Sequence, residues 1–364
     1  MNFVNITDYA RLETRSFNEL PINSVDSLIF SQLSYLKFET LDKTRPFYLG
    51  ELSTATMLTK LTRTLVDFAN FAELGFTVSQ NPRFEDVAIR NIEEKFDKDT
   101  QTQFFALTYE LPNGLCYVAF RGTDNTVIGW KEDFNLSFMK TVPAQDCAVE
   151  YISSYAPTFA GGFYIGGHSK GGNLAIYSAM MCDDNIKQNI IKIFSHDGPG
   201  FNDQTFDKKK FDMIKGRVEK TVPQSSLVGM LLTYTGEYIV VKSSKKGGIL
   251  QHDPMTWLVR DDLSGFEIAD SITKDAVVRN EAIAKWIGGL DDEKRKLFSD
   301  KLYQLLDSTG NNFIDEFAYK WQDSLPKLMS TINSADEQTK EFMGKTLRSL
   351  VQIAVHGRLK PTEE

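Results

Sequence analysis

The sequence has few of the features that would place the protein outside the ordinary globular class. Its three cysteines, Cys116, Cys147 and Cys182, form no CxxC pair and have no neighbouring histidine, which excludes a disulfide-stapled miniprotein and a cysteine-based metal site. No stretch reaches the roughly 18 apolar residues of a membrane span, and the N-terminus lacks the basic and apolar segments of a signal peptide. We therefore expect buried thiols in a cytoplasmic protein without stable membrane insertion.

An excess of positive charge is also missing. The 364 residues contain 41 Lys and Arg against 49 Asp and Glu, and the formal net charge of -8 is opposite to the basic footprint of a nucleic-acid-binding protein. With 41% hydrophobic and 25% charged residues, the chain can bury a core of its own. We expect a globular protein that does not bind nucleic acid, and composition leaves its oligomeric state open.

The hydrophobic pattern divides the chain into three regions. In residues 1–100 the apolar residues recur at helical spacing, which predicts a helical N-terminal region packed on the core. Residues 101–262 contain short β-rich runs, beginning at Thr102 with a hairpin around residues 112–114 and continuing in alternation with helical segments. This alternation predicts an α/β core with a mainly parallel central sheet, and residues 263–364 predict a helical C-terminal region.

The C-terminal region carries two tryptophans, Trp286 and Trp321, without a convergent chemical motif. These aromatic side chains either anchor the helices on the body of the protein or form a surface for a partner. The helices are expected over residues 276–287, 292–306, 313–324 and 337–354.

The sharpest chemical signal is the pentapeptide of residues 167–171, Gly-His-Ser-Lys-Gly. It follows a predicted strand, residues 163–165, and precedes the helical run NLAIYSAMM. A serine exposed on a strand-to-helix turn needs glycines two positions before and after it, because Cβ atoms there would clash with the flanking chain. The pattern favours Ser169 as a nucleophile over the alternative of a structural turn.

A nucleophilic serine needs a base, and the chain offers four histidines. His168, next to the serine, is expected to point away from the direction of attack and to pack, and His356 is expected at the surface. His196 and His252 each follow an apolar strand, where α/β enzymes place active residues. His252 gives the order of the α/β-hydrolases, with histidine last, so we favour it as the base and keep His196 as the alternative.

The acid that orients the base has three candidates. Asp197 ends the strand after the elbow helix, and the glycines that follow it would turn the chain at the rim of the cleft. Asp253 is adjacent to the favoured histidine, and neighbouring side chains of an extended segment diverge. Asp133 lies in a Trp-x-x-Asp segment, which is expected to fix the oxyanion loop rather than to orient the base. We favour Asp197, with Asp133 and Asp253 as alternatives.

Donors for an oxyanion are suggested by Arg121-Gly122-Thr123, which closes the strand CYVAF. A backbone N–H just past a strand can point into the cleft and pair there with the N–H of the residue after the nucleophile, Lys170. The alternative is an Arg-Gly turn that merely ends a hairpin strand.

The sequence resembles the class 3 lipases in three motifs that follow one another along the chain. They are VAFRGT, then Trp130 with Asp133, then GHSKGG. The chain is more similar still to a bacterial family of lipase-related α/β-hydrolases, in the segments VDSLIFSQLSYLKFE, HDGPGF and QHDPMTW. The resemblance implies an α/β-hydrolase fold in which Ser169 is the nucleophile, Thr123 and Lys170 are oxyanion-hole residues and His252 is the base.

The chain departs from the class 3 pattern in two places. Those lipases carry their acid just before a Val-Pro pair, whereas the segment 221–226 contains no carboxylate. Lys170 stands where the lipases have an apolar leucine. Its cation at a helix N-terminus would either favour an anionic substrate group or pair with a nearby carboxylate.

Together these features predict a serine esterase or lipase-like hydrolase that acts on a small-molecule acyl ester through an acyl-enzyme, without a metal or an organic cofactor. The alternatives are a thioesterase or other acyl hydrolase and a noncatalytic scaffold with a hydrolase fold. Residues 124–160 form an insertion with an apolar character given by Phe134, Leu136, Phe138 and Met139, which either line an acyl pocket as a lid or pack onto the sheet.

Overall fold

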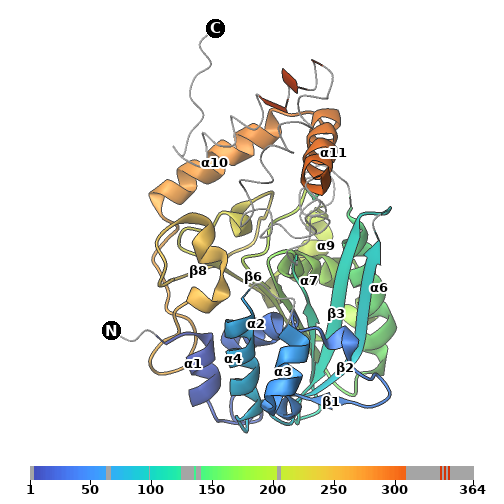
Figure 1. Ribbon diagram of the computed structural model, residues 1–364, viewed down its shortest axis with the longest axis vertical. Helices are drawn as coiled ribbons and strands as arrows, with labels where there is room; N and C mark the ends of the chain where they lie inside the picture. Colours follow the sequence, from blue (N-terminus) through green and yellow to red (C-terminus); the bar gives the residue numbers. More distant parts are fainter. Residues whose placement is uncertain are drawn as a thin grey trace.

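A computed structural model of the chain describes residues 4–62, 67–97, 99–123, 135–136, 141–202, 206–308, 337, 340–341 and 343–344. Within these residues, eight strands form one sheet whose spatial order equals the chain order (Figure 1). The strands are β1 (Phe47–Tyr48), β2 (Ala88–Asp97), β3 (Thr102–Glu110), β4 (Cys116–Phe120), β5 (Phe163–His168), β6 (Ile190–His196), β7 (Val218–Pro223) and β8 (Ile239–Val241). β1 to β4 pair antiparallel and β4 to β8 pair parallel, so the predicted mainly parallel sheet and the β3–β4 hairpin are confirmed.

The sheet begins earlier than the sequence predicts. The expectation that strands start at Thr102 is wrong, because β1 and β2 lie within the region predicted to be helical. β2 has an exposed, charged outer half, and its strand conformation depends on its pairing with β3, from Ala88 opposite Glu110 to Asp97 opposite Thr102. Cross-strand pairing of this kind is not visible in a local pattern.

Helices cover both faces of the sheet. Their bounds are α1 (Ile6–Leu12), α2 (Ser24–Leu33), α3 (Ala55–Thr62), α4 (Phe68–Ser79), α6 (Pro143–Tyr155), α7 (Lys170–Met181), α8 (Asp184–Lys187), α9 (Lys208–Asp212), α10 (Lys274–Gly288) and α11 (Asp292–Ser308). Short 3-10 turns lie at η1 (Phe38–Thr40), η2 (Leu49–Ser53), η3 (Ala156–Thr158), η4 (Lys215–Arg217), η5 (Val228–Met230), η6 (Gly248–His252) and η7 (Pro254–Thr256). Side chains of α1, α2 and α4 fill the core on one face, and those of α6, α7 and α9 fill the core on the other.

Strand β4 shows how the two cores share the sheet. Tyr117 and Ala119 point into the core beneath α2, whereas Cys116, Val118 and Phe120 point into the core beneath α6 and α7. Successive side chains of a strand point to opposite faces, so a strand buried on both faces has a continuous apolar sequence such as CYVAF.

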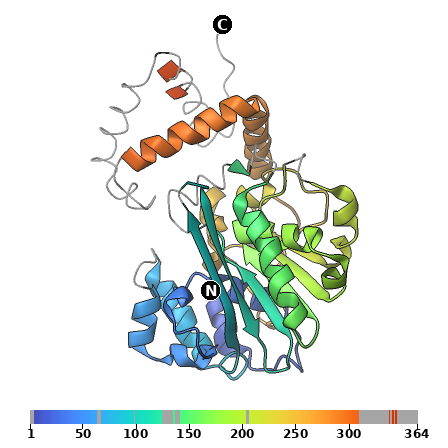
Figure 2. The ribbon, with the colours of Figure 1, turned by 90° about the vertical axis from the view of Figure 1, so that its right-hand side faces the viewer.

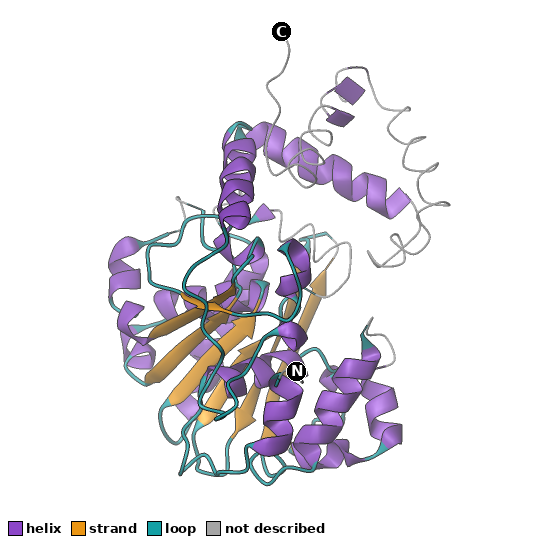
Figure 3. Cartoon of the chain, turned by 90° about the vertical axis from the view of Figure 1, so that its left-hand side faces the viewer, coloured by secondary structure: helices purple, strands orange, loops and turns teal. Residues whose placement is uncertain are grey.

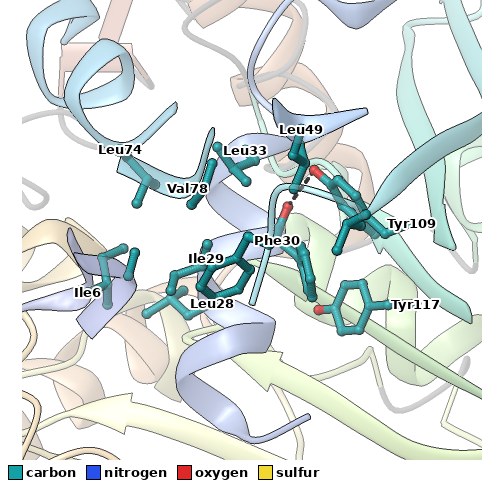
Figure 4. Close-up of a cluster of buried hydrophobic side chains, with 14 of the residues drawn as sticks. Ile6, Leu28, Ile29, Phe30, Leu33, Leu49, Leu74, Val78, Tyr109 and Tyr117 are labelled. Atoms are coloured by element: carbon teal, nitrogen blue, oxygen red, sulfur yellow. Dashed lines mark hydrogen bonds between the residues drawn. The ribbon is translucent and has the colours of Figure 1, made fainter. Parts of the chain in front are cut away.

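Helix α2 is the centre of the first core (Figure 4). Asn23 caps it by accepting hydrogen bonds from the N–H groups of Val25 and Asp26. The ring of Phe30 stacks on Tyr109 at a centroid distance of 4.6 Å, and the Tyr109 hydroxyl donates to the Phe30 carbonyl at 3.1 Å. The N-terminal region is therefore part of the main core.

A fully buried ion pair ties α2 to the segment after α4. Arg83 donates from Nη2 to Oδ2 of Asp26 at 2.6 Å and from Nε to Oδ1 at 2.9 Å, and both side chains are inaccessible to solvent. Arg83 also donates to the carbonyl oxygens of Arg15 and Leu20. The pair therefore fixes the chain entering α2 against the chain entering β2.

Helices α10 and α11 lie beyond one end of the sheet (Figures 2 and 3). They confirm the helices predicted over residues 276–287 and 292–306. Trp286 is buried and packs edge-on against Phe298, with ring centroids 5.5 Å apart. The helices predicted over 313–324 and 337–354 fall on segments outside the described residues, apart from five positions in the second, as do Trp321 and His356.

The insertion of residues 124–160 is described in part. Its second half contains helix α6, which packs against α7 and β3 and so covers the sheet. Leu136 is buried, whereas Phe134, Phe138 and Met139 lie outside the described residues, so the lid stays a prediction.

The predicted burial of the cysteines is confirmed, since all three thiols are buried and unbridged. Every helix in the described part of the chain falls short of the length and hydrophobicity that crossing a membrane requires. The mainly parallel sheet between two helical layers is the α/β-hydrolase fold, and the predicted fold class is confirmed.

Candidate active site

Ser169 lies on the sharp turn between β5 and α7. Its backbone has φ +58° and ψ −130°, a strained conformation for a residue with a Cβ, and its N–H donates to the carbonyl of His196 at 2.9 Å. The first turn of α7 begins at Lys170, directly after the serine. A strand–serine–helix turn of this kind is what a nucleophile elbow requires, and it places the serine at the carboxyl end of the parallel strands.

The glycines on either side of the serine are required by space. A Cβ at Gly167 would lie 2.3 Å from the carbonyl carbon of Gly171, and a Cβ at Gly171 would lie 2.1 Å from the carbonyl oxygen of Phe120. Both distances are far below van der Waals contact with backbone that cannot move aside. The close packing of α7 against the ends of β4 and β5 therefore allows only glycine at these positions.

His252 connects the serine to a carboxylate. Its Nε2 lies 3.1 Å from the Oγ of Ser169, and its Nδ1 lies 2.7 Å from Oδ2 of Asp197. With the ring proton on Nδ1, the imidazole donates to the carboxylate and accepts from the hydroxyl. A histidine held in this way can remove the hydroxyl proton as the serine attacks a carbonyl carbon.

Asp197 is held by three hydrogen bonds. It follows the last residue of β6 with φ +49°, and its side chain is fully buried. Oδ1 accepts from the Ser226 hydroxyl at 2.5 Å and from the Gly229 N–H at 3.1 Å, which leaves Oδ2 for His252. Ser226 and Gly229 come from the segment after β7, so two strand ends together fix the orientation of one carboxylate.

The alternative base, His196, is engaged elsewhere. Its Nε2 lies 2.8 Å from the Ser27 hydroxyl of α2, and its Nδ1 lies 2.8 Å from the Thr221 hydroxyl of β7. Burial lowers the pKa of His196 to about 3, so the ring is neutral near pH 7. Nε2 of His196 therefore serves the contact between α2 and the sheet, and Nδ1 serves the contact between the neighbouring strands β6 and β7.

His168 contacts the favoured base. Its Nε2–H donates to the backbone carbonyl of His252 at 2.9 Å, and the two rings lie 4.5 Å apart. Burial, with smaller contributions from His252 and His196, holds the pKa of His168 well below its usual range. The expectation that His168 packs is met, and its partner is the loop that carries His252.

Of the other acidic candidates, Asp253 accepts a hydrogen bond from the Met255 N–H at 3.0 Å and caps the 3-10 turn η7. Asp133 and Trp130 lie outside the described residues. The carboxylate hydrogen-bonded to His252 is that of Asp197.

The end of β4 lies against the elbow. A Cβ at Gly122 would be 2.6 Å from the carbonyl oxygen of His168 and 3.3 Å from the Cβ of Ser169. Thr123 is the next residue, and Lys170 begins α7 on the other side of the serine. The two segments expected to supply oxyanion donors therefore flank Ser169.

The Lys170 ammonium forms hydrogen bonds within the protein. The side chain is buried, and Nζ donates to the backbone carbonyl and to Oε1 of Gln103 in β3, both at 2.8 Å. The two uses expected for this cation were an anionic substrate group and a carboxylate partner. The observed bonds to Gln103 favour a structural use.

A second buried lysine, Lys220, interacts electrostatically with Asp197. Lys220 lies on β7 with its ammonium 4.3 Å from the ring centre of Tyr234. Burial lowers the pKa of Lys220 to about 8, and the negative charge of Asp197 acts in the opposite direction. Lys220 thus places a positive charge near the carboxylate.

Sequence reasoning missed the residues that support this arrangement. Ser226 lies in the segment 221–226, whose sequence shows only that a carboxylate is lacking. The sequence pattern indicates only that Asn173 is part of a helix. In the structure its side chain donates to the carbonyls of Pro199 and Gly200 and so joins α7 to the turn after Asp197. In the described part of the chain, no group of three His, Cys, Asp or Glu residues is placed to hold a metal ion.

The chain is similar to several solved lipase structures. Among solved structures, M37 lipase is 17% identical, with 58% of this chain and 70% of that chain covered and a TM-score of 0.37. A triacylglycerol lipase described as having a serine protease triad as its catalytic centre is 14% identical, with 68% and 87% covered and a TM-score of 0.38. The native propeptide complex of Rhizomucor miehei lipase is 15% identical, with 72% and 81% covered and a TM-score of 0.34.

No curated protein sequence matches the chain. A family model, Mbeg1-like, matches residues 78–304, which contain Ser169, Asp197 and His252. This match extends over more than half of the chain, and the protein therefore belongs to the Mbeg1-like family.

Proposed function

We propose that the protein is a serine hydrolase that cleaves carboxylic esters through an acyl-enzyme. The observation that carries the proposal is the continuous hydrogen-bonded chain from Ser169 through His252 to Asp197 at the carboxyl end of the parallel strands. Nucleophile, base and orienting acid are the three groups that serine-dependent acyl transfer requires. Both similarity to lipases and the resemblance in sequence motifs agree with this class of chemistry.

In the proposed reaction, the Oγ of Ser169 attacks the ester carbonyl carbon while Nε2 of His252 takes the hydroxyl proton. Asp197 holds the imidazolium through Nδ1–H, and the N–H groups of Thr123 and Lys170 bind the oxyanion. His252 then gives the proton to the leaving alcohol as the carbon–oxygen bond breaks. A water molecule, activated by the same histidine, hydrolyses the acyl-enzyme and restores Ser169.

The test is a series of p-nitrophenyl esters of increasing acyl length, run on the wild-type protein and on Ser169→Ala. We expect hydrolysis by the wild type and a loss of several orders of magnitude in the variant, since triad deletions leave only the residual rate from binding and the oxyanion hole. A thioester series in parallel separates an esterase from a thioesterase. A folded wild type that hydrolyses neither series would favour the noncatalytic scaffold.

The cytoplasmic location and the small-molecule acyl ester substrate remain predictions from the sequence. Lys170, which could have selected an anionic substrate, is bonded to Gln103. The proposal therefore does not assign a charge to the substrate.

A further inference from the structure

A residue of the N-terminal region is fixed beside the candidate site. Tyr35 follows the end of α2, and the carbonyl oxygens on either side of it both accept hydrogen bonds from Arg121 at the end of β4. Nε donates to the Ser34 carbonyl at 2.6 Å and Nη2 to the Leu36 carbonyl at 3.0 Å. Arg121 therefore fixes the backbone around Tyr35 by hydrogen bonds, and it belongs to the segment 121–123 that is expected to bind the oxyanion.

Arg121 is itself held firmly. Its guanidinium lies 3.4 Å above the ring centre of Phe105, contacts Glu39 at 3.2 Å, and is almost fully buried. A planar guanidinium that stacks on a ring and donates to two carbonyls has little freedom to move. The contacts of the buried Arg121 side chain therefore fix the position of Tyr35 relative to β4.

The hydroxyl of Tyr35 reaches the surface of Gly122 next to the serine. A Cβ built on Gly122 would lie 2.3 Å from the Tyr35 hydroxyl oxygen and 3.3 Å from the Cβ of Ser169. The phenolic oxygen and the Cβ of Ser169 thus flank the same small volume beside the end of β4. These groups, together with the carbonyl oxygen of His168 at 2.6 Å from the same Cβ position, can approach Gly122 because glycine has no side chain there.

We propose that Tyr35 is a catalytic residue whose hydroxyl donates a hydrogen bond to the substrate carbonyl oxygen as Ser169 attacks. The inference rests on the proposed ester hydrolysis at Ser169. The phenolic proton stays on Tyr35 throughout, so the residue stabilises the negative charge of the tetrahedral intermediate without transferring a proton. A preorganised donor at the developing oxyanion lowers the barrier without a need for reorganisation.

The competing account gives Tyr35 only a packing role. Its ring lies 5.9 Å from that of Phe71 in α4, and a ring contact of this kind is kept by phenylalanine. Tyr35→Phe therefore removes the hydroxyl and leaves the packing. Tyr109→Phe is the matched control. It also removes the hydroxyl of a buried tyrosine, but that hydroxyl donates to the Phe30 carbonyl within the core beneath α2.

The experiment measures kcat and KM for p-nitrophenyl butyrate, the affinity for a butyl trifluoromethyl ketone and the unfolding temperature. For Tyr35→Phe we expect kcat to fall by about 10²-fold, as for other single oxyanion donors, with KM nearly unchanged. The trifluoromethyl ketone, which forms a tetrahedral adduct with serine, should lose affinity by a similar factor. Tyr109→Phe should lower the unfolding temperature and leave kcat near the wild-type value.

The inference is overturned if Tyr35→Phe keeps kcat within about threefold of the wild type, or if kcat falls while the ketone binds as before. Both results would leave the proposed function standing, because the wild type would still hydrolyse the ester. A wild type that neither hydrolyses esters nor reacts with a fluorophosphonate would instead remove the proposed function and this inference with it.

Discussion

Replacing Asp197 by asparagine should abolish most of the activity by reversing one hydrogen bond. Oδ1 of Asp197 accepts from Ser226 and Gly229, and Oδ2 faces Nδ1 of His252 at 2.7 Å. An asparagine keeps its carbonyl oxygen toward Ser226 and Gly229, because an amide N–H would face the Gly229 N–H. Its NH2 group then points at His252 and donates to Nδ1, which moves the ring proton to Nε2.

With a proton on Nε2, His252 no longer accepts the hydroxyl hydrogen of Ser169. The same exchange in a serine protease triad lowers kcat by about 10⁴, which at roughly 1.36 kcal/mol per factor of ten raises the barrier by about 5 kcal/mol. We expect a loss of this size for Asp197→Asn. KM should change little, since the substrate does not contact the carboxylate.

The assay follows p-nitrophenyl ester hydrolysis together with thermal unfolding, which reports whether the variant is folded. Asp253→Asn is the matched control, because its carboxylate bonds to the Met255 N–H and should leave the rate near wild type. The reasoning is refuted if folded Asp197→Asn keeps more than about a tenth of the wild-type kcat. It is also refuted if Asp253→Asn or Asp133→Asn is the inactive variant.

Three further predictions concern the base and the core. His252→Ala should match the defect of Ser169→Ala in kcat. His196→Ala should instead mainly lower the free energy of unfolding, because it removes one hydrogen bond from each of the buried Ser27 and Thr221 hydroxyls; ester kinetics and urea unfolding rank the two variants. Arg83→Met should cost about 3–5 kcal/mol of unfolding free energy by stranding the Asp26 carboxylate, and a loss below about 1 kcal/mol in urea unfolding would contradict this. The pKa of His196 is lowered to about 3, so between roughly pH 6.5 and 3 the unfolded chain binds a proton that the folded chain does not. The free energy of unfolding should therefore fall on acidification by up to about 1.4 kcal/mol per pH unit. His196→Gln should reduce this slope when unfolding is measured from pH 7 to 4.

The parts of the site that the sequence predicts are those with a local signature. The elbow is a strand, a serine between glycines and a helix, and each requirement falls within a dozen residues of Ser169. His252 follows from the order of elements along the chain, and Asp197 from the end of β6. These predictions need only the sequence period, the turn residues and the order of the strands.

The supporting contacts join residues that no local pattern connects. The Ser226 hydroxyl reaches Asp197 because β6 and β7 are neighbours in the sheet, and His168 reaches the His252 carbonyl across 84 residues of chain. Tyr35 comes to the elbow through Arg121, in a region whose pattern indicates only helices. Such contacts depend on tertiary packing, which also decides that β2 is a strand.

The central claim is that Ser169 is the nucleophile, and covalent labelling tests it most directly. The folded protein is treated with a fluorophosphonate, its intact mass is measured, and the modified peptide is mapped, with Ser169→Ala treated in parallel. We expect one adduct per chain on Ser169 and none on the alanine variant, because only a serine activated by a histidine attacks the phosphorus quickly. An adduct on another residue, equal labelling of Ser169→Ala, or an unlabelled wild type that is folded would contradict the account.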